Sequence, residues 1–233
     1  MSEAEEYAKA VRSVADFGTR TLDVSEKVGS FLARVFKEPM QEVSGIITDK
    51  LKFIRWRRLV QMADEVNNIS FEKGVQETRG VPPKLALPIF EGSSLEDDPS
   101  LQHLWNHLLA NAMNPEFNGE LRYGFIDVIK NITGIEALIL NKFYEALNRE
   151  GELDVTKVTN YFLRKEDIIK MLGIDEATYE ISIYNLMRMQ CIGPAIIKGS
   201  SIRMGDEPMT IYKGTDAVVL TPLGVKFVEA CIK

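Results

Sequence analysis

Apolar residues recur at helical spacing from the N-terminus to about residue 66. Residues 1–36 carry them in two groups, and the second group includes Val28 and Phe31. Pro39 then marks a boundary, and a second amphipathic pattern follows over about residues 40–66. We therefore expect two helical stretches in this part of the chain.

The middle of the chain predicts further helices with short connections. Pro82, Pro83 and Pro88 favour an extended segment followed by short helical turns. The acidic segment at residues 95–100 precedes a stripe of leucines and a tryptophan, which is typical of a helix start. Two more helical patterns follow, over Phe125–Ile132 and Ile135–Leu147.

In the last third of the chain the pattern changes, because two apolar strands follow a series of helices. Helices are expected at about residues 135–149, 165–172 and 175–190, strands at 194–198 and 216–220, and a closing helix at 222–232. Three helices followed by a two-stranded wing is the order of a winged helix-turn-helix unit. We therefore predict a mainly α fold, in which a helical N-terminal and core region precedes a winged helix-turn-helix-like α+β domain.

A family signature lies in the middle of the chain. Its residues are Val81-Pro82-Pro83-Lys84-Leu85-Ala86, Asp97 to Gln102, Leu104 to Met113, Gly124 to Lys130 and Ile135-Glu136-Ala137. Together these residues resemble the abortive infection alpha (Abi-alpha) family of bacterial proteins. The region upstream fits more loosely, so the resemblance covers about residues 40–147. It implies an all-helical core and a role in resistance to bacteriophages, and it supplies no catalytic residue.

These patterns divide the chain into three parts. An N-terminal helical segment over residues 1–38 has a candidate self-association face. An Abi-alpha-like helical domain is expected over residues 39–134, and a winged-helix-like domain over residues 135–233.

The charge balance excludes a globally basic nucleic-acid binder. The 233 residues include 28 Lys and Arg against 34 Asp and Glu, which gives a net charge of -6. Residues 81–136 hold 3 basic and 8 acidic groups, so most of the excess negative charge lies there. Contact with an anionic partner must therefore come from a local patch.

One such patch lies at the centre of the second helical pattern. Its candidate contacts to an anion or a membrane are Lys50, Lys52, Arg55, Arg57 and Arg58. A basic amphipathic helix can lie on an anionic membrane or bind phosphates. The first 80 residues are neutral overall and offer acidic neighbours, which favours a solvated face over an anionic partner.

The helix at 175–190 would be the recognition helix of a winged unit. Its first turns offer Asp175, Glu176 and Glu180, and its only cation is Arg188, near the other end. Acids at that end oppose contact with DNA, since recognition helices present donors there. The candidate wing contacts are Lys198, Arg203 and Lys213, and three charges give only weak, salt-sensitive binding. We therefore expect a winged fold used for protein contacts.

Few residues offer catalytic or metal-binding chemistry. His103 and His107 stand four apart, a spacing that suits one metal ion, but the chain has no other histidine. Cys191 and Cys231 lie among apolar neighbours, which favours buried structural thiols. The acids at residues 96–98 suit a helix N-terminus better than a cation. We expect no enzyme activity, no cofactor and no bound metal.

The N-terminus argues against export. Glu3, Glu5 and Glu6 stand where a secretion signal needs positive charge. No stretch reaches the ~20 apolar residues of a spanning helix. We therefore expect a cytoplasmic protein whose cysteines are reduced.

The leading hypothesis is therefore a non-enzymatic phage-defence protein that acts by binding a protein partner or a second copy of itself, with a homo-oligomer expected. One alternative is a winged-helix DNA-binding transcription regulator. Another is a peripheral membrane effector that uses the basic helix near residues 50–58. No small-molecule substrate is indicated.

Overall fold

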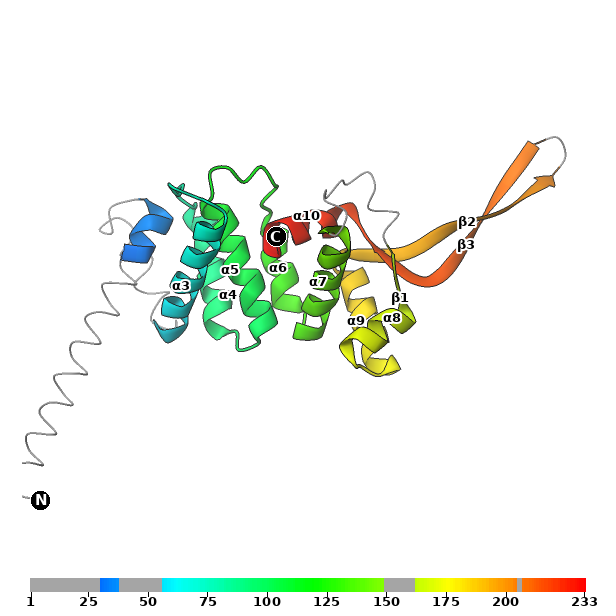
Figure 1. The fold of residues 1–233 in the computed structure, drawn as a ribbon, viewed down its shortest axis with the longest axis horizontal. Helices are drawn as coiled ribbons and strands as arrows, with labels where there is room; N and C mark the ends of the chain where they lie inside the picture. Colours follow the sequence, from blue (N-terminus) through cyan, green and yellow to red (C-terminus); the bar gives the residue numbers. More distant parts are fainter. Residues whose placement is uncertain (1–29, 38–55, 149–161, 205–206) are drawn as a thin grey trace, which may run out of the picture. The chain divides into compact units, whose positions relative to one another are not determined.

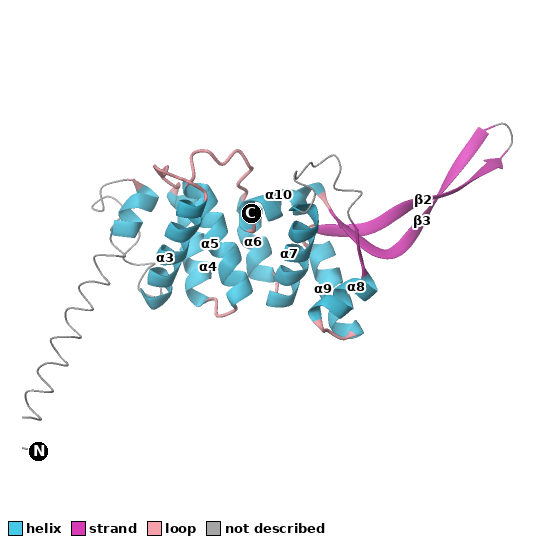
Figure 2. Cartoon of the chain, in the orientation of Figure 1, coloured by secondary structure: helices cyan, strands magenta, loops and turns pink. Residues whose placement is uncertain are grey.

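The computed structural model describes residues 30–37, 56–148, 162–204 and 207–233. Helices predominate, and one small antiparallel sheet of three strands accompanies them (Figures 1 and 2). The chain divides into two compact units. The first contains the described residues up to 95 together with 112–117, and the second contains 96–111 and the described residues from 118 onwards.

The first unit is helical. It holds a helical segment over residues 30–36, α3 (Trp56–Glu72) and α4 (Pro83–Leu95). The Phe90 ring packs edge-on against the rings of Phe31 and Phe36, with centroids 6.1 Å apart in both pairs. The predicted helical patterns are thus confirmed where the chain is described, and residues 1–29 and 38–55 lie outside the described part.

The expectation of only short turns after the prolines is wrong, because α4 is a helix of 13 residues. Pro83 stands at the first helical position. A backbone N–H there would make no hydrogen bond within the helix, so its absence in proline costs nothing. Pro88 lies inside the helix and removes one backbone hydrogen bond. Burial of Leu87, Ile89 and Phe90 around it offsets that loss.

The helices that carry the family signature are α5 (Pro99–Met113), α6 (Tyr123–Asn131) and α7 (Gly134–Asn148). All three were predicted from the sequence, with starts within a few residues of those observed. The Leu/Trp stripe of α5 is buried, and Trp105 is among the largest buried side chains of the described chain. This stripe is core, as its spacing indicates.

The remaining elements follow in the order β1 (Phe162–Arg164), α8 (Lys165–Leu172), α9 (Glu176–Arg188), β2 (Ile192–Met204), β3 (Glu207–Leu220) and α10 (Pro222–Cys231). The three helices agree with the predicted ones. The sheet has the order β1-β3-β2, and all its pairs are antiparallel. Strand β1 was not predicted, and β2 and β3, with 13 and 14 residues, are longer than the two short strands expected.

Helix α10 closes the second unit against α5 and α6. Thr221 caps it by accepting a hydrogen bond from Gly224 N at 3.0 Å. Asn111 Nδ2 donates to the Ala230 carbonyl at the other end of α10, at 2.9 Å. The rings of Phe125 and Phe227 meet edge-on with centroids 5.6 Å apart. Helix α10 is therefore part of the core of this unit.

Candidate functional site

Most of the basic patch cannot be placed. Lys50, Lys52 and Arg55 lie outside the described residues, as does the side chain of Arg57. Arg58 is half-buried in α3 and donates a hydrogen bond to Gln61 Oε1 at 3.3 Å. The patch therefore stays a prediction.

The wing candidates lie on the paired part of β2 and β3. Lys198 pairs with Tyr212, Arg203 with Pro208, and Lys213 with Ile197. Only their backbones belong to the described part of the chain, so their contact with an anionic partner also stays a prediction.

The two histidines lie side by side on α5. Their rings are 4.1 Å apart between centroids, and His107 Nδ1 lies 3.2 Å from the Lys233 carbonyl oxygen. His103 is exposed and His107 is half-buried, so both flank the buried stripe. Within the described ranges, no three potential metal ligands come together.

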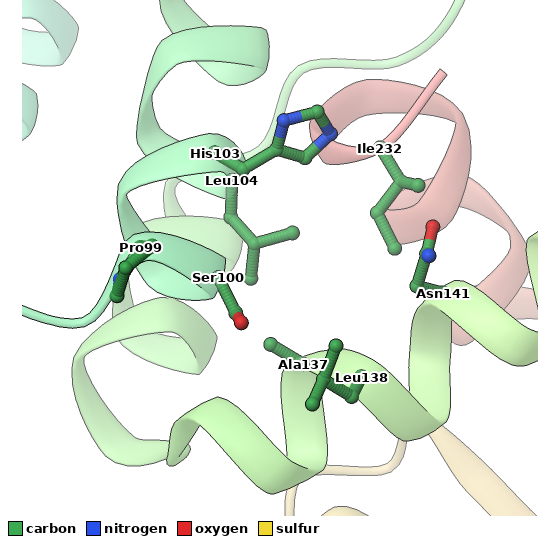
Figure 3. Close-up of a pocket in the computed structure, with 8 residues that line it drawn as sticks. All are labelled: Pro99, Ser100, His103, Leu104, Ala137, Leu138, Asn141 and Ile232. Atoms are coloured by element: carbon green, nitrogen blue, oxygen red, sulfur yellow. The ribbon is translucent and has the colours of Figure 1, made fainter. Parts of the chain in front are cut away.

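A cavity of about 300 Å³ opens beside His103 (Figure 3). Its lining comes from α5, α7 and the residue after α10: Pro99, Ser100, His103, Leu104, Ala137, Leu138, Asn141 and Ile232. Three of these side chains are polar, and the Asn141 amide donates to Glu145 Oε1 at 3.1 Å. The rest of the wall is apolar. His103 is the one ionisable side chain in this lining, so the cavity holds no second acid or base beside it.

Both cysteines are buried and free, as the sequence indicates. Burial raises the pKa of the Cys191 thiol to about 12. Burial also raises the pKa of Cys231, and the charge of a nearby Cys191 thiolate raises it further. Since the thiolate is the nucleophile, these thiols are inert in the folded protein.

The acids before α5 cap that helix, as predicted. Asp98 Oδ1 accepts hydrogen bonds from Ser100 N at 2.7 Å and from Leu101 N at 3.3 Å. Glu96 Oε1 accepts from the two backbone N–H groups that follow it, those of Asp97 and Asp98. These carboxylates therefore bind backbone donors at the start of α5.

Glu136 joins two parts of the second unit. It is 2% exposed, and one carboxylate oxygen accepts from Thr133 N at 2.5 Å, which satisfies a backbone donor at the start of α7. The other oxygen accepts from Asn185 Nδ2 at 2.9 Å, and the same amide nitrogen donates to the Asn131 carbonyl at 2.8 Å. This hydrogen bond fixes α9 against α7.

A lysine neutralises part of the acidic start of α9. Lys165, the first residue of α8, makes ion pairs with Glu176 and with Glu180, the latter at 3.2 Å. Hydrogen bonds to Glu176 and then Glu180 raise the pKa of Lys165. Asp175 caps α9 by accepting from Thr178 N at 2.7 Å, and this bond lowers the pKa of Asp175. Sequence reasoning missed Lys165, because only the turn between α8 and α9 brings it near.

The outer face of α9 exposes apolar side chains. Ile181 is 70% exposed and Tyr184 is 69% exposed, although both belong to a helix whose opposite face is buried. Ala177 and Arg188 continue the same face one turn before and one turn after them and are also exposed. We call Ala177, Ile181, Tyr184 and Arg188 the α9 face. Two large apolar side chains, Ile181 and Tyr184, thus lie next to each other on the exposed side of α9.

Comparison with known protein families gives a match. Residues 57–231 match the family described as abortive infection alpha, which is about three quarters of the chain. The chain belongs to the abortive infection alpha family. The Abi-alpha match extends past residue 147, so the family region includes α8, α9, the sheet and α10. No curated protein and no solved structure matches the chain.

The polar residues of the Abi-alpha signature hold the fold together. Asp98 caps α5, Glu136 caps α7, and Asn111 binds the last turn of α10. Most of the apolar residues of the signature are buried, whereas Leu85 and Ile135 are half-buried and Pro82 and Pro83 are exposed. Among the described residues, no helix has both the length and the apolar character needed to cross a bilayer.

Proposed function

We propose that this Abi-alpha protein is a non-enzymatic phage-defence protein that acts through protein–protein contacts made by the α9 face. Membership of the family supports the defence role. The exposure of Ile181 and Tyr184 on α9 carries the proposed mechanism.

We also propose that residues 135–233 form a winged helix-turn-helix-like domain, in which α7, α8 and α9 are the three helices. Helices α8 and α9 are joined by a short turn in which Gly173 has φ +63°, and the hairpin of β2 and β3 follows in the position of a wing. In that arrangement α9 stands where a DNA-binding member presents its recognition helix.

The chemistry of α9 favours a protein over DNA. Its first turns carry Asp175, Glu176 and Glu180, and one lysine, Lys165, pairs with both glutamates. Its exposed centre offers Ile181 and Tyr184, which have no complement on a phosphate backbone. Tyrosine and large aliphatic groups are instead suited to the buried centre of a protein interface.

The roles of the other polar groups support a protein without catalysis. The carboxylates of Asp98 and Glu136 are occupied by backbone donors, and the two thiols are buried. Two unpaired cysteines also fit a reducing compartment, so we propose a cytoplasmic location.

The test is a plating experiment with bacteriophages on cells that express the chain. We expect wild-type protein to lower plaque numbers, and Ile181→Glu and Tyr184→Glu to restore them at least tenfold. Phe71→Glu, which alters an exposed aromatic residue of α3, is the matched control and should protect like the wild type. Protection that survives both α9 substitutions would overturn the mechanism.

A second measurement addresses the regulator alternative. The purified chain should not bind random duplex DNA even at low salt, where phosphate contacts are strongest. Low-salt binding that is lost when Lys198, Arg203 and Lys213 are changed to glutamate would favour DNA instead.

A further inference from the structure

The α9 face has the spacing of a helix-pairing seam. Its members stand at positions 177, 181, 184 and 188, so the steps between them are four, three and four residues. This alternation keeps side chains on one line along a helix and is the spacing through which two helices interlock. The opposite side of α9 is occupied by the core of its own unit, through Tyr179, Ser182, Ile183 and Leu186.

The charges of α9 are arranged with opposite signs at its two ends. Asp175, Glu176 and Glu180 lie at the start, and Arg188 is the last residue of the helix. The backbone dipole adds partial positive charge at the start and partial negative charge at the end. Two such helices side by side in opposite directions would bring Arg188 of each copy alongside the acidic start of the other.

We infer that the α9 face pairs antiparallel with the α9 face of a second copy of this chain, an inference that rests on the proposed use of this face for protein contacts. The symmetry axis passes between Ile181 and Tyr184, so Ile181 of each copy lies opposite Tyr184 of the other. Arg188 of each copy then lies opposite Ala177 of the other, within reach of Glu176 or Glu180. One patch thus supplies both halves of an isologous interface.

A second copy suits this face better than a partner with one uniform charge. The acidic start of α9 in each copy has the charge opposite to Arg188 at the end of α9 in the other copy. A parallel pair is disfavoured, since it would set the acids of both copies together. The small side chain of Ala177 leaves room for the long side chain of Arg188.

The face is also held in place before it binds. The bond from Asn185 to Glu136 fixes α9 against α7, and the pairing of Lys165 with Glu176 and Glu180 fixes its first turns against α8. Little ordering is therefore needed on association. Two apolar residues per copy make a small interface, so we expect association to be weak and to depend on protein concentration.

The first experiment is sedimentation equilibrium of the full chain with charge variants. Arg188→Glu alone, and Glu176→Lys with Glu180→Lys in another chain, should each weaken association at least tenfold. An equimolar mixture of the two variants should recover it, because the altered charges then complement each other. Phe71→Glu is the control and should associate like the wild type. A mixture that does not recover overturns the inference.

The second experiment tests the direction of pairing by oxidative cross-linking. An equimolar mixture of Ala177→Cys chains and Arg188→Cys chains, in which each mixed pair keeps one Arg188 opposite one Ala177, should give a covalent dimer, whereas Ala177→Cys alone should not. In the antiparallel pair the two copies of position 177 are about 16 Å apart along the axis at 1.5 Å per residue, beyond the ~7 Å that a disulfide spans. Cys191 and Cys231 do not interfere, because they are buried. Efficient cross-linking of Ala177→Cys alone would overturn the antiparallel arrangement.

The two proposals fail in different ways. If the wild type is monomeric at 200 μM while Ile181→Glu still abolishes protection from phage, the α9 face binds another protein, so the inference falls and the proposed function stands. If the dimer forms as described but variants that break it protect fully, the proposed function falls and the inference stands.

Discussion

Replacing Gly134 by alanine tests the contact between the starts of α5 and α7. A Cβ built at Gly134 lies 2.1 Å from Asp98 Oδ2 and 2.7 Å from its Cγ, closer than non-bonded atoms approach. The Asp98 carboxylate must therefore move away. It then gives up its hydrogen bonds from Ser100 N and Leu101 N, which cap α5.

The magnitude follows from two opposing effects. Loss of an aspartate N-cap costs about 1 kcal/mol and at most about 2. Alanine in place of glycine in a helix returns about 0.5–1 kcal/mol where no clash occurs. The net effect expected of Gly134→Ala is a free energy of unfolding lower by about 0–1.5 kcal/mol. Gly124 of α6 is the matched control: its Cβ would meet nothing within 4 Å, so Gly124→Ala should raise that free energy by about 0.5–1 kcal/mol.

The decisive assay is urea denaturation in two backgrounds, followed by circular dichroism and with the m-value monitored. In wild type, Gly134→Ala should move the midpoint to lower urea. In the Asp98→Ala background the carboxylate is absent, so Gly134→Ala should be neutral or stabilising. An equal loss in both backgrounds would refute the contact as the cause, because independent sites add.

Three further outcomes are expected. Gly224→Ala puts a Cβ 1.9 Å from the Cys191 carbonyl oxygen, which cannot rotate away, so it should lower the free energy of unfolding, measured by urea denaturation, by about 2–3 kcal/mol. The control is Gly193→Ala, whose Cβ would have its nearest neighbour at 3.8 Å, and equal effects of the two substitutions would contradict the clash. The thiols of Cys191 and Cys231 should not react with DTNB at pH 8 until the protein unfolds, and rapid reaction in the native state would contradict their burial. The hydrogen bond from Thr178 lowers the pKa of Asp175 below its usual 3.8, so the contribution of this cap is complete above that pH and is lost as the pH falls through the lower folded value. The protection factor of the Thr178 amide, which corrects for the slower intrinsic exchange at low pH, should therefore fall in acid. At pH 7 it should be lower than in the wild type in Asp175→Ala but not in Asp175→Asn, and identical protection factors in all three proteins would rule out the cap.

Helix positions were predictable where capping and apolar spacing agree. The Asp98-Pro99 and Thr221-Pro222 pairs mark the starts of α5 and α10, and α8 has the predicted bounds. The errors arise where tertiary contacts decide. Strand β1 has three residues and exists because β3 pairs with it, and the long β2–β3 hairpin continues through Gly and Ser residues that read locally as a loop.

The candidate site was predictable only in part. The acidic start of α9 is plain in the sequence, and so are the caps. The α9 face was not predicted, because α9 has apolar residues on several sides and spacing alone does not say that Ile183 is buried while Ile181 and Tyr184 are exposed. That distinction needs the position of α7, which Asn185 and Glu136 set through a contact between residues far apart in the chain.

The packing of α10 on the family helices has a consequence for synthesis on the ribosome. Phe125 of α6 meets Phe227 of α10, about 100 residues later in the chain. At about 5–20 residues per second, α6 waits about 5–20 s before its aromatic partner exists. During that interval the buried side of α6 has no cover from α10, so the nascent chain exposes apolar surface to chaperones until α10 has been synthesised.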